Sequence, residues 1–219
     1  MAVSSTGEFR LCHLLTSDMN NNLTYFRRSE EFDFYGIVES MPVHQNPCKN
    51  GGSWEAAQNR CVCPVNNKGD HCEWIKLNTN PVHLESKNDK FGPFNAIQSG
   101  QILKFKLVYI SGGMSCWITE PGYEITKFGC GPNLAVLITN TSDQIISPNP
   151  SYVHNVHWFY NLPGVTSNDK EIILPAIDPP LHVTAGQEFR LWYGEDLSNE
   201  GFEGDNVGTL DVDIFVIYK

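Results

Sequence analysis

Four of the seven cysteines lie within one short segment, and this clustering constrains the fold more than any other feature. The segment contains almost no aliphatic side chains, so it cannot fold by burying apolar surface. Disulfide bonds must supply the missing stability, each contributing about 2–4 kcal/mol. Four cysteines permit three pairings, and we do not expect Cys61 to pair with Cys63, one residue away. This leaves Cys48–Cys61 with Cys63–Cys72, or a crossed arrangement.

Residues 45–74 resemble an EGF-like module in their cysteine spacing and in the glycine that precedes the last cysteine. The resemblance implies the disulfides Cys48–Cys61 and Cys63–Cys72. Trp54 stands where the family has a further cysteine, so one disulfide of the family is absent and we expect Trp54 to pack the small core. The acidic signature of calcium-binding EGF-like modules is also absent, which predicts no calcium in this module.

From residue 75 to the end, hydrophobic and polar residues alternate as in strands with one buried face. The alternation is clearest at residues 103–109, 189–193 and 210–218. Shorter apolar runs between clusters of Gly, Pro, Asn and Ser occupy residues 134–139, 156–160, 172–174 and 181–184. The fold class is therefore mostly β, with the small disulfide-rich module followed by an antiparallel β-sandwich or jelly roll over residues 75–219.

The remaining three cysteines divide between the β domain and the N-terminal arm, residues 1–44. Cys116 and Cys130 enclose a glycine-rich stretch, and we expect a third disulfide between them. The alternative, a metal site, lacks spaced His or Cys partners nearby. Cys12 is left without a partner, either because its partner is missing or because it is a free or intermolecular thiol.

The order of these parts resembles secreted cnidarian proteins of the coral skeletal organic matrix type. In these, a PAN/apple domain precedes an EGF-like module and a C-terminal galactose-binding-like β domain. The resemblance rests on residues 11–36, on the EGF-like block and on residues 189–208, which include Phe-Arg-Leu-Trp-Tyr-Gly-Glu-Asp-Leu and Asp-Asn-Val-Gly. It implies that residues 1–44 are the tail of a truncated PAN/apple domain and that Cys12 has lost its partner with the missing half.

Charge and cysteine content indicate where the protein works. With 25 acidic and 15 basic residues, a net charge of −10 and a pI near 5.1, the chain is a poor candidate for binding nucleic acid or an anionic membrane surface. No apolar run approaches the ~20 residues of a membrane span. The cysteines and the glycosylation sequons at Asn22 and Asn140 predict a secreted, extracellular glycoprotein. Because the chain starts without a signal peptide, we expect a mature fragment or a missing beginning.

The acidic loop, residues 194–208, is the main candidate for a functional site. Its carboxylates are Glu195, Asp196, Glu200, Glu203 and Asp205. Several carboxylates so close together repel one another unless solvent or a cation screens them, and hard oxygen ligands at irregular spacing suit Ca²⁺. The alternative is an acidic, solvated rim. Asp211 and Asp213 alternate with core residues, so we expect them to face outward as solubilising groups.

The Asp-Asn-x-Gly sequence before the last strand resembles calcium-dependent lectins with a galactose-binding jelly-roll fold. In those proteins such a loop holds the ion, and the ion and loop side chains hold sugar hydroxyls. The resemblance implies Ca²⁺ as cofactor, with Asp205 and Asn206 as the first ligands and Glu195 and Asp196 as the next. We expect the ligand-binding residues to include Trp192 or Phe202 as a stacking platform and Glu203 as a further contact.

Other chemistry finds little support in the sequence. His154 and His157 would face opposite sides of a strand, so we interpret them as ordinary histidines and not as a metal pair. No nucleophile elbow, phosphate loop or dinucleotide motif is present. A glycosidase would need a carboxylate in an apolar pocket that raises its pKa, and the Gly, Ser and Asn neighbours do not predict one.

We therefore predict a non-enzymatic extracellular matrix or adhesion protein. Its β-sandwich would present the acidic loop, loaded with Ca²⁺, to glycans or extracellular matrix proteins. One alternative is a mineral-associated structural protein with a diffuse acidic patch, and another is a hydrolase acting on glycans. A third is an internal domain of a larger receptor or toxin-associated protein. The sequence leaves the oligomeric state open.

Overall fold

The computed structural model describes residues 25–28, 35–38, 46–117, 124–154, 157–198 and 203–219. The chain forms two compact units, Met1–Asn46 and Pro47–Lys219. In the first unit, β1 (Tyr25–Arg28) pairs antiparallel with β2 (Tyr35–Val38). Cys12 and Asn22 lie outside the described residues, so the predictions about them and about a PAN/apple remnant stay predictions.

The disulfide-rich module forms at the start of the second unit, and its bonds are the predicted Cys48–Cys61 and Cys63–Cys72. Its hairpin pairs β3 (Ser53–Glu55) with β4 (Arg60–Val62), so that the half-buried Trp54 lies opposite Cys61. Gly52 is essential to this packing, because a Cβ there would come within 2.6 Å of the Cys72 Sγ atom.

The module continues into the larger sheet of the β-sandwich without a linker. β5 (Asn67–Lys68) lies in the last disulfide loop and pairs with β6 (Trp74–Lys76), which in turn pairs with β17 (Val207–Tyr218). The Lys68 Nζ atom sits 5.0 Å from the Phe215 ring centroid. Because β5 and β6 belong to the same sheet, the structure keeps Pro47–Lys219 as one unit.

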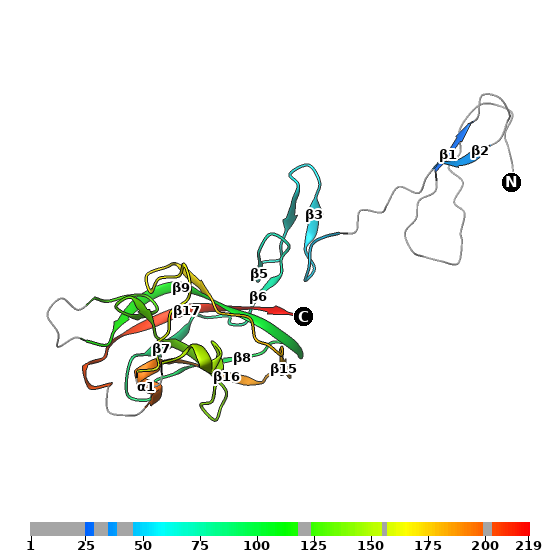
Figure 1. Ribbon diagram of the computed structural model, residues 1–219. Coiled ribbons are helices and arrows are strands. Elements are labelled where there is room, and N and C mark those ends of the chain that lie inside the picture. The colour runs from blue at the N-terminus through cyan, green and yellow to red at the C-terminus, as the bar shows by residue number, and fades with distance from the viewer. Residues whose placement is uncertain (1–24, 29–34, 39–45, 118–123, 155–156, 199–202) are drawn as a thin grey trace. The chain divides into compact units, whose positions relative to one another are not determined.

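Two antiparallel sheets form the sandwich, as the alternating pattern predicted (Figure 1). The larger sheet has the order β14-β9-β17-β6-β5, with β15 also paired to β9 and β7 paired to β17. Its further strands are β7 (Val82–Glu85), β9 (Gly100–Ser115), β14 (Glu171–Ile173) and β15 (Leu181–Val183). The smaller sheet is β13-β12-β16-β8, with β8 (Gly92–Asn95), β12 (Val136–Thr139), β13 (Ile145–Ser147) and β16 (Glu188–Tyr193).

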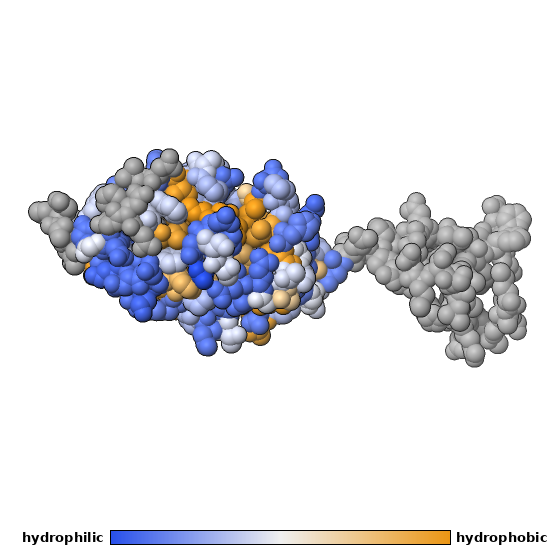
Figure 2. Space-filling view, turned by 90° about the horizontal axis from the view of Figure 1, so that it is seen from below, coloured by the Kyte–Doolittle hydropathy of each residue, from blue (hydrophilic) through white to orange (hydrophobic). Residues whose placement is uncertain are grey.

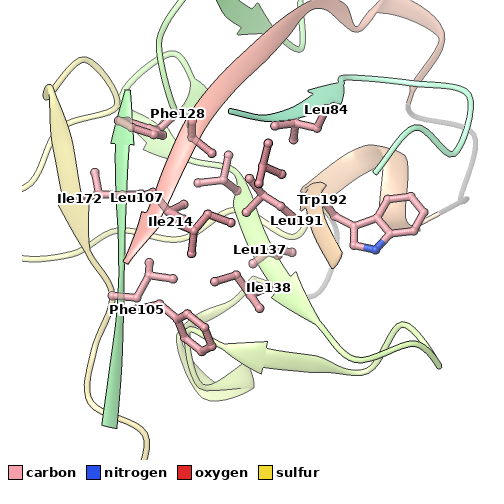
Figure 3. Close-up of a cluster of buried hydrophobic side chains, with 14 of the residues drawn as sticks. Leu84, Phe105, Leu107, Phe128, Leu137, Ile138, Ile172, Leu191, Trp192 and Ile214 are labelled. Atoms are coloured by element: carbon pink, nitrogen blue, oxygen red, sulfur yellow. The ribbon is translucent and has the colours of Figure 1, made fainter. Parts of the chain in front are cut away.

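The core lies between the two sheets and is built from the inward side chains of their strands (Figure 3). Phe189 of β16 packs against Phe94 of β8 and Phe105 of β9, with ring centroids 5.6 and 6.0 Å away. Each such side chain contributes about 1.5–3 kcal/mol by burial. A register shift near the end of β17 interrupts the alternation at the start of residues 103–109, so that Ile102 is fully buried and Leu103 only partly.

The paired strands β9 and β17 run the length of the sandwich and carry the candidate site at one end. Gly208 at the start of β17 has φ +103° and lies against Gly113 of β9, where a Cβ would meet the carbonyl oxygen. The predicted disulfide Cys116–Cys130 joins the segment after β9 to β10 (Gly129–Cys130), which pairs with β11 (Asn133–Leu134). This end of the sandwich is therefore held covalently as well as by strand pairing.

The surface of the domain is mixed. Figure 2 shows hydrophobic residues exposed between hydrophilic ones on the face it presents. Such exposure is normal, because a folded chain lacks enough polar surface to cover itself. Among the described helices, none has the length and apolar character needed to cross a membrane.

Candidate functional site

Three segments meet at the end of the sandwich where β16 stops. The first contains α1 (Gly194–Ser198) and η2 (Glu203–Asp205), which lie between β16 and β17. The second is the turn at residues 86–91 between β7 and β8. The third is the stretch that follows η1 (Pro150–Tyr152). Gly194 allows the first segment to approach the third segment closely. A Cβ at this position would lie only 2.7 Å from the Trp158 carbonyl oxygen.

Glu195 is the central side chain of the site. It is 2% exposed, which does not fit the acidic, solvated rim that was the alternative interpretation of this loop. Its Oε1 atom accepts a hydrogen bond from His157 Nδ1 at 2.9 Å. Its Oε2 atom is buried and has no hydrogen-bond partner among the described residues. The site therefore contains a carboxylate with one oxygen fixed and one oxygen open.

Burial raises the pKa of Glu195 from its usual 4.5 to about 7. The nearby charge of Asp205 adds to the rise, whereas His157 and Asn206 favour the ionised form and oppose it. The expectation that this loop would not raise a carboxyl pKa was therefore wrong. The error arose because Gly, Ser and Asn neighbours in sequence do not show that the side chain turns inward beside Tyr193.

Asn206 supplies a second open oxygen. It is 1% exposed, and its Nδ2 atom donates to the Ser86 carbonyl oxygen at 2.9 Å. Its Oδ1 atom has no hydrogen-bond partner among the described residues, and the same holds for the buried Ser86 Oγ atom. An unpartnered buried polar atom costs about 1–3 kcal/mol, so a site with several of them favours a ligand that would satisfy them.

Asp196 and Glu203 hold the 86–91 turn in place. The Asp196 oxygens accept the backbone N–H groups of Asp89 and Lys90 at 2.9 and 3.1 Å. Glu203 Oε2 accepts the N–H of Asn88 at 2.9 Å. Asn88 and Asp89 have φ values of 68° and 55°, a conformation that Asn and Asp tolerate well. The pKa of Asp196 is raised to about 6, chiefly by burial; the neighbouring Glu203 contributes to this rise, and the backbone N–H groups of Asp89 and Lys90 oppose it.

Trp192 does not present a ring face to solvent, because it is 4% exposed. Its indole points toward the turn between β7 and β8 (Figure 3) and packs against the partly buried Phe91, with ring centroids 4.9 Å apart. The Arg190 guanidinium lies 4.4 Å from the Phe91 centroid and pairs with Asp143 at 2.8 Å. Phe91 is thus the aromatic ring nearer to solvent, and the proposed stacking role of Trp192 does not fit this conformation.

The structure brings together most of the predicted site residues. Glu195, Asp196, Glu203 and Asn206 line the same end of the sandwich, and the charge of Asp205 acts on both Glu195 and Tyr193. Phe202 lies outside the described residues. Asp211 and Asp213 alternate with buried residues of β17, but they are not free solubilising groups, because they pair with His83 and Lys76 and their side chains are only 30% and 13% exposed.

Sequence reasoning missed His157, Ser86 and Phe91. The prediction of a strand at residues 156–160 was wrong for its described part, which has only an isolated bridge at Tyr160. His157 instead lies in a turn, where the argument about opposite strand faces does not apply. No local motif marks these contacts, because His157 lies 38 residues from Glu195 and Ser86 lies 120 residues from Asn206.

The donor set suits a hard cation better than a soft one. Within the described residues, no group of three or more His, Cys, Asp or Glu side chains is arranged to hold a metal ion. A cation here would need other oxygens as well, such as the open amide oxygen of Asn206 and the Ser86 hydroxyl. Carboxylate, amide and hydroxyl oxygens completed by water form the type of shell that Ca²⁺ uses.

Comparisons with known proteins agree with this architecture. No protein-family model matches the chain, and a search of curated proteins found no match. Among solved structures, the chain is similar to AJLec from the sea anemone Anthopleura japonica, with a TM-score of 0.57 and 25% sequence identity. The similarity covers 67% of this chain and 97% of AJLec. The β-sandwich is therefore lectin-like, and the likeness to a sea anemone lectin agrees with the predicted cnidarian character of the β domain.

The predicted glycosylation site at Asn140 lies on the turn between β12 and β13. The Asn140 Oδ1 atom accepts the N–H groups of Ser142 and Gln144, and its Nδ2 atom donates to the Gln144 side chain. Thr141 and Ser142 are exposed. Glycosylation at Asn140 stays a prediction. Disulfides and a lectin-like fold are typical of extracellular proteins.

Proposed function

We propose that this protein is a non-enzymatic, extracellular carbohydrate-binding protein whose recognition site is the loop cluster around Glu195 and Asn206. The observation that carries the proposal is the pair of buried, unpartnered oxygens, Glu195 Oε2 and Asn206 Oδ1, on a lectin-like sandwich. Folding leaves these oxygens unsatisfied at a cost, and a bound ligand would recover that cost. We further propose that the protein acts in adhesion or in an extracellular matrix.

We propose Ca²⁺ as the ion that Glu195, Asn206 and Asp205 hold. Glu195 Oε2 and Asn206 Oδ1 have lone pairs available, and Asp205 adds a second negative charge close to Glu195. Bound Ca²⁺ would supply coordination positions for sugar hydroxyl groups. We assign Asp196 to bracing the 86–91 turn, because both of its oxygens already accept backbone hydrogen bonds.

Binding is favoured over hydrolysis by the arrangement of the carboxylates. The raised pKa of Glu195 is a property that a general acid requires. Glycoside hydrolysis also needs a second carboxylate that is free to act on the substrate. Asp196 is engaged by the N–H groups of Asp89 and Lys90, Glu203 accepts the N–H of Asn88, and we assign Asp205 to the ion. The likeness to a lectin points in the same direction.

The deciding experiment compares glycan-array binding and thermal unfolding of the full chain with Ca²⁺ and with chelator. We expect saturable stabilisation by Ca²⁺ and glycan binding that the chelator abolishes. The variant Glu195→Gln should lose both responses. Glu55→Gln is the matched control, because this substitution removes the same charge at a position outside the site. Glu55 pairs with Arg60 on the surface of the EGF-like module.

Each alternative function gives a different outcome. A mineral-associated acidic patch would give a shallow, salt-sensitive response to Ca²⁺ that Glu195→Gln barely changes. A hydrolase would release products from the glycans of the array, and Glu195→Gln would stop the release while leaving binding intact. Absence of any glycan binding in the presence of Ca²⁺ would refute the proposal.

A further inference from the structure

We propose that His157 is a positioning residue of the site: it holds one oxygen of Glu195 so that the other is presented to the ligand. The inference rests on the proposed function, because it concerns the same ion site. From the sequence alone, His157 was interpreted as an ordinary histidine without a role in binding.

The direction of the hydrogen bond follows from the chemistry of the pair. When Glu195 is ionised it only accepts hydrogen bonds, and His157 then carries a proton on Nδ1 and donates that N–H to Glu195 Oε1. The two atoms are 2.9 Å apart, a normal length for a charge-assisted bond. With Oε1 held in this way, the carboxylate plane is fixed and Oε2 keeps its lone pairs available.

The imidazole ring is itself held in position. It stacks on the Phe159 ring, with centroids 5.6 Å apart and planes 20° from parallel. Two backbone hydrogen bonds close the turn that carries it: His154 N–H donates to the Phe159 carbonyl oxygen, and Trp158 N–H donates to the His154 carbonyl oxygen. The donor is therefore supported by both its ring and its backbone.

The difference in exposure between the two side chains indicates that His157 positions Glu195 and is not itself a core residue. The His157 side chain is 43% exposed, whereas the Glu195 side chain is 3% exposed. A side chain that reaches from solvent to fix a buried carboxylate contributes little to the core but restricts the geometry of that carboxylate. Partners of this kind change metal affinity by roughly 10–100-fold when they are removed.

Two variants of His157 distinguish the effect of its N–H donor from the effect of its aromatic ring. His157→Phe keeps an aromatic ring beside Phe159 but removes the N–H donor. His157→Asn removes the ring but keeps a donor at the position of Nδ1. Because His154 is exposed and lies in the same turn, His154→Phe is the matched control. Ca²⁺ affinity of the full chain is measured by calorimetry, and thermal unfolding in chelator reports on structure alone.

We expect His157→Phe to weaken Ca²⁺ binding by roughly 10–100-fold. His157→Asn should bind much more tightly than His157→Phe, and His154→Phe should match the wild type. If His157→Phe lowers the unfolding temperature in chelator but binds Ca²⁺ as tightly as the wild type, the positioning role is wrong while the ion site stands. If the wild type binds no Ca²⁺ at all, the ion site and the positioning role both fall.

Discussion

Replacing Glu195 by glutamine should stabilise the calcium-free protein above neutral pH while it removes the response to Ca²⁺. Burial raises the pKa of Glu195 to about 7 from the usual 4.5. Below pH 4.5 the carboxyl group is protonated in the folded and unfolded states alike, so it adds no pH-dependent cost. As the pH rises toward 7, the unfolded chain loses this proton first, and the stability of the folded protein decreases.

The structure sets the size of this effect. Each unit of difference between the folded and unfolded pKa is worth about 1.4 kcal/mol, so the rise from 4.5 to about 7 corresponds to about 3 kcal/mol. Glutamine carries no charge at any pH and can still accept the hydrogen bond from His157. The variant should therefore exceed the wild type by about 3 kcal/mol once the pH is above 7.

Urea unfolding of both proteins in calcium-free buffer, followed by tryptophan fluorescence, measures the difference directly. The difference in unfolding free energy should be small near pH 4.5 and should grow until the pH passes 7. Adding Ca²⁺ should then stabilise the wild type alone. A difference that stays constant across this pH range would refute the reasoning, because it would show that Glu195 is not buried as a costly charge.

Three further predictions test the scaffold. Phe189→Ala should lower the unfolding free energy by about 3–5 kcal/mol in chemical denaturation, because the ring is fully buried against Phe94 and Phe105; a loss below about 1 kcal/mol would contradict the burial of this ring in the core. Cys116→Ser should cost about 2–4 kcal/mol in thermal unfolding, and an unchanged melting temperature would argue against the third disulfide. Asp211→Asn should reduce stability at neutral pH, because hydrogen bonds from Ser111 and His83 lower the pKa of this carboxyl. The wild-type advantage should vanish as the pH falls below the usual 3.8, and an advantage that persists in acid would contradict this assignment.

The sequence predicted those features that depend on neighbouring residues. Strand alternation located β9, β16 and β17, because a strand with one buried face shows its pattern over a few residues. The pairings Cys48–Cys61 and Cys63–Cys72 came from a resemblance in spacing, and the structure has both. The acidic loop was recognised because its carboxylates are close together in the chain.

The sequence did not predict which of those carboxylates are buried. Glu195 turns inward because α1 packs on the His157–Trp158 turn, and that contact depends on how distant segments meet. The same holds for Asn206, whose amide reaches the carbonyl oxygen of Ser86 at the end of the neighbouring strand β7, 120 residues away in the chain. Trp192 was one of two residues expected as a stacking platform, but its ring packs against Phe91, and only the folded chain places these two rings together.

The continuity of β5, β6 and β17 has a mechanical consequence. A pulling force applied at Pro47 would pass through Cys48–Cys61 and Cys63–Cys72 and then load the hydrogen bonds between β6 and β17 directly. No flexible linker lies between the EGF-like module and the β-sandwich that could extend under this force. Tension on the module would therefore reach the very strand whose first residue, Val207, follows Asn206.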